Sequence, residues 1–310
     1  MILTVLALVA AATVAAVSGV VDVGGRLASA RPEWLLLATG LELASVFGFI
    51  ATVQLVFGEW LPKRLSLRMG LVVRAATIVA PGGGLAAVGI GAKALRNGRM
   101  QGNRAPRAIA FLLLTNAPNF IALGLFGTAL GAGLLSGPNT PVLTFVPAAI
   151  GFATIGATLL IPKVSKQRSA RVPPSSPRRA ISGAARALEL GVIEARSLVA
   201  GRSWKLLGAG AYYAADNAVL WATFSAFGHV HPPVALFAMA YLIGSAAGSV
   251  PVPAGIGVVE GGMIGLLALY GAPALCAAIA VLAYRAISIG LPLALGGLAF
   301  IGLFRRVREV

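Results

Sequence analysis

The sequence predicts an all-α fold: a polytopic membrane helical bundle with about six crossings plus two re-entrant, broken-helix hairpins in inverted orientation. Of its 310 residues, 58% are hydrophobic and only 11% are charged, whereas a soluble domain carries about 25% charged residues. Apolar stretches of about 20 residues recur along the chain, and each is long enough to cross a bilayer core. Prolines and glycines interrupt two of these stretches, which a membrane tolerates only where protein or a water-filled cavity satisfies the broken backbone.

The first half, residues 1–162, is predicted to cross at residues 3–21, 34–57, 108–134 and 142–161. The first stretch is expected to be a retained helix rather than a signal peptide, because no Lys or Arg precedes its long apolar run. The apolar segment 71–92 is interrupted at Pro81 and lies between two basic clusters. These clusters predict a re-entrant hairpin that opens to the cytoplasm, although two short crossings also satisfy the charges. The first cluster comprises Lys63, Arg64, Arg68 and Arg74, the last of which lies at the start of the segment, and the second comprises Lys93, Arg96, Arg99, Arg104 and Arg107 after it.

Residues 163–202 are predicted to form a cytoplasmic loop followed by an interfacial helix. Residues 163–179 are basic and rich in proline and serine, as loops are. Beyond them, apolar residues at 181, 185, 188, 192, 195 and 199 form a helical stripe, with the charges mostly elsewhere. The stripe favours a helix that lies in the membrane interface, and a cytoplasmic helix packed on the bundle is the alternative.

The second half, residues 203–310, is predicted to cross at residues 206–227 and 272–304 and to form a hairpin at residues 234–271. The hairpin breaks within VPVPAGIGVVEGG, residues 250–262. If the break turns the chain back outward, both termini are cytoplasmic and every basic cluster lies on the inner face. Broken segments of opposite orientation, at Pro81 and Pro253, indicate an inverted-repeat transporter with one site near the midplane.

Four charged residues are predicted at membrane depth: Glu42, Asp216, Glu260 and Arg285. Each is costly there unless it is paired or hydrated, and Arg285 has Glu260 and Asp216 as possible partners. The planar guanidinium of Arg285 matches the geometry of a lipid phosphate. A structural ion pair that holds the last helix to the hairpin explains the same residues equally well.

Glycines and prolines at the two breaks complete the candidate site, because they let backbone N–H groups and half-helix N-termini approach a phosphate. Close helix packing through small residues is the alternative. The predicted substrate-binding set comprises Arg285, Glu260, Pro253, Gly255, Gly257, Pro81, Gly82, Gly83, Gly84 and Asp216.

No catalytic constellation is found, so the chain is expected not to be an enzyme and to need no cofactor or metal. Its nine acidic residues are dispersed, and His229 and His231 lack the partners of a zinc site. The net charge of +16 does not indicate nucleic-acid binding, because the basic residues lie at the ends of apolar segments. A single cysteine, Cys276, excludes an intrachain disulfide.

Two motifs carry a resemblance to a known family. Residues 252–265, VPAGIGVVEGGMIG, with YRAIS at 284–288 and Leu291-Pro292, resemble the flippase-like transmembrane region of lysylphosphatidylglycerol synthases and their stand-alone relatives. Residues 80–98, APGGGLAAVGIGAKALRNG, are similar to that family's first broken-helix motif, and Ala254 stands where the family usually has glycine. We expect a stand-alone member, because the 310 residues contain no soluble synthase domain.

The resemblance implies a flippase that moves an anionic or aminoacylated phospholipid, or another lipid-linked head group, between leaflets of a bacterial plasma membrane. The implied partners are the lipid, a second copy of the chain or a separate soluble synthase, and not nucleic acid. Two alternatives stay open: a membrane transferase or transferase partner acting on a lipid phosphate, and an ion-coupled carrier of a small solute.

Overall fold

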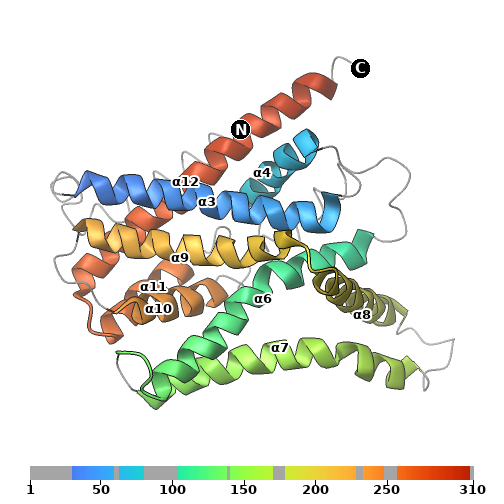
Figure 1. Cartoon of the computed structure of the whole chain (residues 1–310), viewed down its shortest axis with the longest axis horizontal. Coiled ribbons are helices and arrows are strands. Elements are labelled where there is room, and N and C mark those ends of the chain that lie inside the picture. Colours follow the sequence, from blue (N-terminus) through green and yellow to red (C-terminus); the bar gives the residue numbers. More distant parts are fainter. Residues whose placement is uncertain are drawn as a thin grey trace.

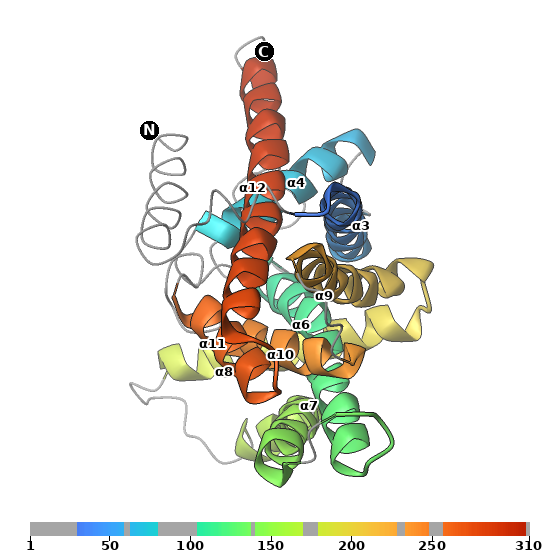
Figure 2. The same ribbon diagram turned by 90° about the vertical axis from the view of Figure 1, so that its left-hand side faces the viewer.

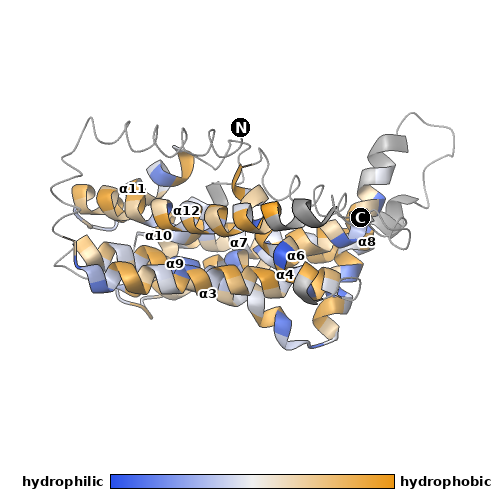
Figure 3. Cartoon of the chain, turned by 90° about the horizontal axis from the view of Figure 1, so that it is seen from above, coloured by the Kyte–Doolittle hydropathy of each residue, from blue (hydrophilic) through white to orange (hydrophobic). Residues whose placement is uncertain are grey.

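The computed structural model describes residues 30–58, 63–79, 104–137, 140–169, 179–227, 233–247 and 257–307. Within these ranges the chain is almost wholly helical and contains no strand, which confirms the predicted all-α class (Figure 1). Hydrophobic residues cover most of the long helices, and hydrophilic residues are confined to short patches (Figure 3). The architecture is that of a helical membrane bundle.

In the described part of the chain, four helices are long and apolar enough to cross a membrane: α3 (Pro32–Phe57), α6 (Arg104–Gly131), α7 (Pro141–Ser169) and α12 (Ala274–Val307). They correspond to the crossings predicted at residues 34–57, 108–134, 142–161 and 272–304. The crossing predicted at 206–227 corresponds to helix α9 (Leu207–Phe227). Its 21 residues are enough to span a bilayer core, and they include the polar residues Asp216 and Asn217. The crossing predicted at residues 3–21 lies outside the described residues.

Two shorter apolar helices, α10 (Val234–Ala247) and α11 (Val258–Leu269), form the arms of the hairpin predicted at residues 234–271. They have 14 and 12 residues, so they are about 21 and 18 Å long, less than the roughly 30 Å of a bilayer core. The arms pack against each other, and a Cβ added at Gly244 would meet the side chain of Met263. The break itself, residues 248–256, lies outside the described residues.

Two helices start or end differently from the prediction. Helix α4 (Lys63–Val79) begins eight residues before the predicted hairpin 71–92, and residues 80–92 lie outside the described residues. Helix α7 continues past Pro162 to Ser169, so the first part of the loop predicted at 163–179 is helical. The physical reason is that Lys, Gln and Arg favour helix, and one internal proline does not outweigh a long helix that already packs.

Helices α3 and α9 lie side by side as an antiparallel pair, and they are the first described α-helices of the two halves (Figures 1 and 2). The backbone N–H of Arg31 donates to the carbonyl of Ala226 at 3.1 Å, and Gly48 lies against Gly208 near the other end of the contact. Helix α4 of the first half packs against α12 of the second, and α10 of the second packs against α6 of the first. Each half therefore contributes packing surface to the other.

Helices α6 and α7 form a tight antiparallel pair at one side of the bundle (Figure 1). Glycines at the contact let the backbones approach, because a Cβ at Gly127 or Gly151 would meet backbone of the opposite helix. Helix α8 (Arg179–Ala200) packs on both of them. It is held there by an ion pair between Arg107 and Glu194 at 3.1 Å. The contacts thus agree with a helix packed on the bundle, and its position relative to the membrane interface stays a prediction.

The described helices form two apolar cores, and both include residues of α3. The larger core is built from α9, α10, α11 and α12 and includes Val219, Tyr241, Met263 and Val281. The smaller core joins α3, α4 and α6 through the buried residues Phe49, Val53, Val56, Val73 and Phe111. Helix α3 contributes to both cores, since Ala38 belongs to the larger one.

The glycine contact between α3 and α9 predicts that Gly48→Ala destabilises the protein. The added Cβ would lie 2.7 Å from the carbonyl oxygen of Gly208 and 2.7 Å from the backbone nitrogen of Tyr212. Such overpacking costs about 1–3 kcal/mol, so the melting temperature in detergent should fall. The control is Gly40→Ala on the same helix, where a Cβ meets nothing within 4 Å. Equal melting temperatures for the two variants would contradict the close crossing.

Candidate functional site

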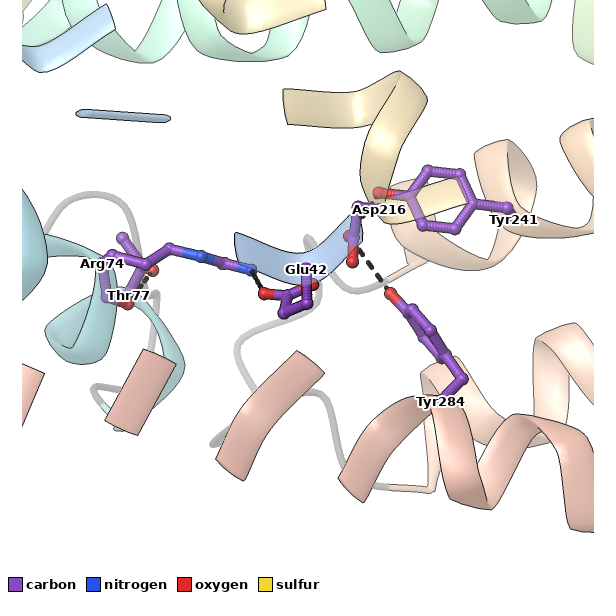
Figure 4. Close-up of polar contacts among 6 residues, drawn as sticks. All are labelled: Glu42, Arg74, Thr77, Asp216, Tyr241 and Tyr284. Carbon is purple, nitrogen blue, oxygen red and sulfur yellow. Dashed lines mark hydrogen bonds and ion pairs between the residues drawn. The ribbon is translucent and has the colours of Figure 1, made fainter. Parts of the chain in front are cut away.

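The polar centre of the bundle lies where α3 and α9 face each other. The register set by Arg31 beside Ala226 and Gly48 beside Gly208 brings Glu42 level with Asp216. Both side chains are buried, with 0% and 4% of their surface exposed. Their carboxyl groups face each other and interact electrostatically (Figure 4). Two acids therefore meet inside an apolar bundle, and each must find a partner there.

Arg74 of helix α4 is the cationic partner of Glu42. Its Nη2 lies 3.6 Å from Glu42 Oε1, and only 8% of Arg74 is exposed. The guanidinium also lies over two aromatic rings, 5.0 Å from the centroid of Tyr212 and 5.7 Å from that of Phe49. Aromatic faces stabilise a desolvated cation, so these rings and Glu42 together hold a charge that apolar surroundings alone would reject.

Two tyrosines hold Asp216. The hydroxyl of Tyr241 on α10 donates to Asp216 Oδ2 at 2.6 Å, and the hydroxyl of Tyr284 on α12 donates to the same oxygen at 3.1 Å. Figure 4 shows Glu42 between Arg74 on one side and Asp216 with its tyrosines on the other. We name Glu42, Arg74, Asp216, Tyr241 and Tyr284 the central cluster. Its five members come from five helices, α3, α4, α9, α10 and α12.

The central cluster is not fully satisfied by hydrogen bonds. Within the described residues, both carboxylate oxygens of Glu42, Oδ1 of Asp216 and Nε of Arg74 are buried and lack a hydrogen-bond partner. Buried polar atoms in proteins are nearly always paired, and each exception calls for a physical reason such as a bound group. The oxygens among these atoms can accept further hydrogen bonds, and Nε of Arg74 can donate one.

A second polar group joins α11 to α12. Arg285 Nε lies 2.6 Å from Glu260 Oε1, and the backbone N–H of Gly257 donates to Glu260 Oε2 at 2.6 Å. Gly257 has a φ of +85°, a conformation that glycine adopts without strain just before the first turn of α11. The carboxylate of Glu260 thus occupies the N-terminal end of the helix, where an anion is stabilised. We name Gly257, Glu260 and Arg285 the anion cluster.

A line of polar side chains also crosses from α6 to its neighbours. Tyr213 of α9 donates its hydroxyl proton to Asn116 Oδ1 at 3.1 Å. One helical turn later, Asn119 Oδ1 accepts from the hydroxyl of Ser245 on α10 at 3.0 Å. Asn116 is exposed and Asn119 is buried, so this polar line runs from the outer surface of α6 toward its buried side.

Several predicted site residues are brought together, in two groups rather than one. Arg285 pairs with Glu260, one of its two predicted partners, while Asp216 is held by tyrosines. Gly257 lies in the anion cluster. The groups meet on α12, where Tyr284 and Arg285 are consecutive. The remaining predicted residues lie outside the described residues: Pro81, Gly82, Gly83, Gly84, Pro253 and Gly255.

The position of Arg74 differs from the prediction. The sequence places Arg74 in a cytoplasmic basic cluster, whereas the structure buries it against Glu42. Its neighbours in the sequence could have indicated burial, because the residues on both sides of Arg74 are apolar, unlike those around Lys63 and Arg64. Glu42 was recognised as a charge at membrane depth but was left out of the predicted site. Tyr241 gave no signal, because a tyrosine inside an apolar helix is usually a packing residue.

Comparison with known proteins gives the family. The model of the lysylphosphatidylglycerol synthase transmembrane (TM) region matches residues 2–296, nearly the whole chain. A search of curated proteins finds no match. The matched range includes both clusters and every described helix up to most of α12. The chain is therefore an integral membrane protein that belongs to the lysylphosphatidylglycerol synthase transmembrane-region family.

Proposed function

We propose that this protein is a flippase that moves an anionic or aminoacylated phospholipid between the leaflets of a bacterial plasma membrane. The observation that carries the proposal is the anion cluster, a guanidinium and a glycine-capped helix start within an apolar bundle. Buried ionisable groups in membrane helices mark substrate and ion pathways. A phospholipid presents a negatively charged phosphate, which is the chemistry that this arrangement recognises.

The geometry supports a specific way of binding the phosphate. Glu260 accepts one bond from Arg285 at Oε1 and one from the backbone of Gly257 at Oε2, as two oxygens of a phosphate would. We propose that Glu260 acts as a built-in anion that a lipid phosphate displaces. Both side chains keep about a tenth of their surface exposed, 13% for Arg285 and 10% for Glu260, so the pair is reachable.

The polar line on α6 supports passage of a head group. Asn116 offers an amide group at the surface of α6, and Asn119 and Ser245 continue this line of polar groups toward its buried side. Such groups replace part of the hydration that a head group loses inside a membrane. The acyl chains do not require polar contacts. They can lie against the exposed leucine, isoleucine and phenylalanine side chains that cover the outer faces of α3, α6 and α7.

Leaflet exchange in liposomes tests the function directly. Purified protein is reconstituted with acyl-labelled phosphatidylglycerol or lysylphosphatidylglycerol, and the fraction accessible to an impermeant quencher is followed over time. We expect protein-dependent exchange of these lipids, with protein-free liposomes and labelled phosphatidylcholine as controls. No acceleration of either lipid would contradict the proposal and favour the transferase or small-solute alternatives.

Substitutions in the anion cluster test the binding mode. Arg285→Lys keeps the charge but loses the bidentate fork, so exchange should slow by about tenfold, the loss of one charge-assisted hydrogen bond. Glu260→Gln should strengthen phosphate binding, because the displaced group no longer competes as an anion. The control is Arg196→Lys on the exposed face of α8, which should leave exchange unchanged.

The same residues also give the outcome that opposes this binding mode. If Arg285 and Glu260 only hold α12 to α11, Arg285→Met and Glu260→Gln should each lower the melting temperature by stranding a buried group. The double variant would then recover stability. Unstable single variants rescued in the double variant would rule out the displaced-anion scheme, whereas stable single variants with altered exchange support it.

Cysteine accessibility tests the proposed cytoplasmic position of the termini. The natural Cys276 is first replaced by alanine, and single cysteines are introduced at Ser165, near Val310 and at exposed Ser136 between α6 and α7. In intact cells an impermeant thiol reagent should label Ser136→Cys and spare the other two, because basic segments stay inside. Outside labelling at Ser165→Cys would reverse the proposed orientation.

A further inference from the structure

The central cluster has more acids than bases. Glu42 and Asp216 face each other, and Arg74 is the guanidinium paired with them. If both carboxyl groups were ionised, these three side chains would carry one uncompensated negative charge. Each of them is at least nine-tenths buried, where such a charge is expensive and where two carboxylates sharing a site do not both ionise readily.

The hydrogen bonds of the pair also indicate that one proton is missing from the two ionised carboxyl groups. Both oxygens of Glu42 and Oδ1 of Asp216 lack a hydrogen-bond partner among the described residues, while Asp216 Oδ2 accepts two tyrosine hydroxyls. Carboxylate oxygens only accept hydrogen bonds, so two facing carboxylates cannot satisfy each other. One proton placed on either carboxyl group turns it into a donor toward the other, and it also cancels the extra charge.

Among the described residues, the other groups around the pair do not supply this proton. Tyr241 and Tyr284 already donate to Asp216, and the Tyr212 ring lies beneath Arg74. On α11 and α12, Glu260 and Arg285 are paired with each other. Helix α6 presents the uncharged amides Asn116 and Asn119. Among the described residues, the titratable or charged groups that interact with the pair are Arg74, Tyr212, Tyr213, Tyr241 and Tyr284, and Arg285 interacts with Tyr212 and Tyr284.

We infer that Glu42 and Asp216 share one exchangeable proton, and that this proton is the cation coupled to transport. The coupling rests on the proposed lipid transport, whereas the proton site does not. The pair joins α3 to α9, the first described helices of the two halves, and Asp216 is also tied to α10 and α12. Loss of the proton restores repulsion between the two halves, and alternating access moves one half against the other.

A proton fits this site better than a metal ion. A hard cation such as Ca²⁺ takes about six to eight oxygen ligands, and even Mg²⁺ requires six in octahedral geometry. Among the described residues, no three His, Cys, Asp or Glu side chains gather as a metal site would need. One side of Glu42 already faces the guanidinium of Arg74, which repels a second cation.

Infrared spectroscopy tests the proton site without any transport measurement. In lipid nanodiscs at neutral pH, the wild type should show the carbonyl band of a protonated carboxyl group. Glu42→Gln and Asp216→Asn should each abolish it, because the remaining acid is balanced by Arg74. Glu33→Gln, at an exposed position on the same helix, should leave the band unchanged. A wild type without the band, or both single variants with it, would overturn the site.

One further variant and a folding control support this result. Arg74→Met removes the cation and leaves both acids, so the carboxyl band should persist or grow. If one of the single variants does not fold, the other decides the question, because either acid alone should release the same proton. Melting temperatures identify such a case before spectra are compared.

Liposomes with a pH difference test the coupling. One pH unit is a tenfold difference in proton activity, so the distribution of labelled phosphatidylglycerol between leaflets should shift by up to about tenfold per coupled proton. Glu42→Gln and Asp216→Asn should lose this response. A response to a sodium gradient in place of a pH gradient would overturn the choice of ion. Lipid that stays in its leaflet under every gradient would overturn the coupling together with the proposed function, and the infrared result would still decide the proton site.

Discussion

A charge inside an apolar bundle must be neutralised at its own depth, because neither water nor a distant surface residue compensates it there. This constraint organises the centre of the molecule. Glu42, Asp216 and Arg74 satisfy it only by bringing α3, α9 and α4 together, and the tyrosines that complete the cluster add α10 and α12. Five helices therefore converge on one point, and Tyr241 and Tyr284 of the central cluster are also part of the larger apolar core.

The helices of the bundle were largely predictable because length and apolarity are local properties. Residues 34–57, 108–134, 142–161 and 272–304 all became long helices, and the hairpin 234–271 has two short helical arms. The depth of Arg74 was not predictable in the same way. Counting basic residues places Arg74 with Arg68, but the packing of α4 on α12 carries it into the bundle. Which helices pack together is decided by contacts between distant segments, which composition does not record.

The candidate site shows the same division between local and distant information. That Arg285 needed a carboxylate partner followed from the cost of a buried charge, but the choice between Glu260 and Asp216 depended on how α11 and α12 meet. The tyrosines around Asp216 were invisible for a related reason, since a hydroxyl in an apolar run becomes a ligand only once a distant acid is opposite it. The approach of Pro81 to Pro253 at one central site stays a prediction.

The adjacency of Tyr284 and Arg285 has a mechanical consequence. Consecutive residues of an α-helix point about 100° apart, so α12 directs one side chain to Asp216 and the next to Glu260. Rotation of this helix about its own axis moves the Tyr284–Asp216 contact and the Arg285–Glu260 contact at the same time. A ligand that rotates α12 by drawing Arg285 away from Glu260 therefore also changes the hydrogen bond between Tyr284 and Asp216. Binding of a ligand at the anion cluster is therefore coupled to the central cluster through the peptide bond that joins Tyr284 and Arg285.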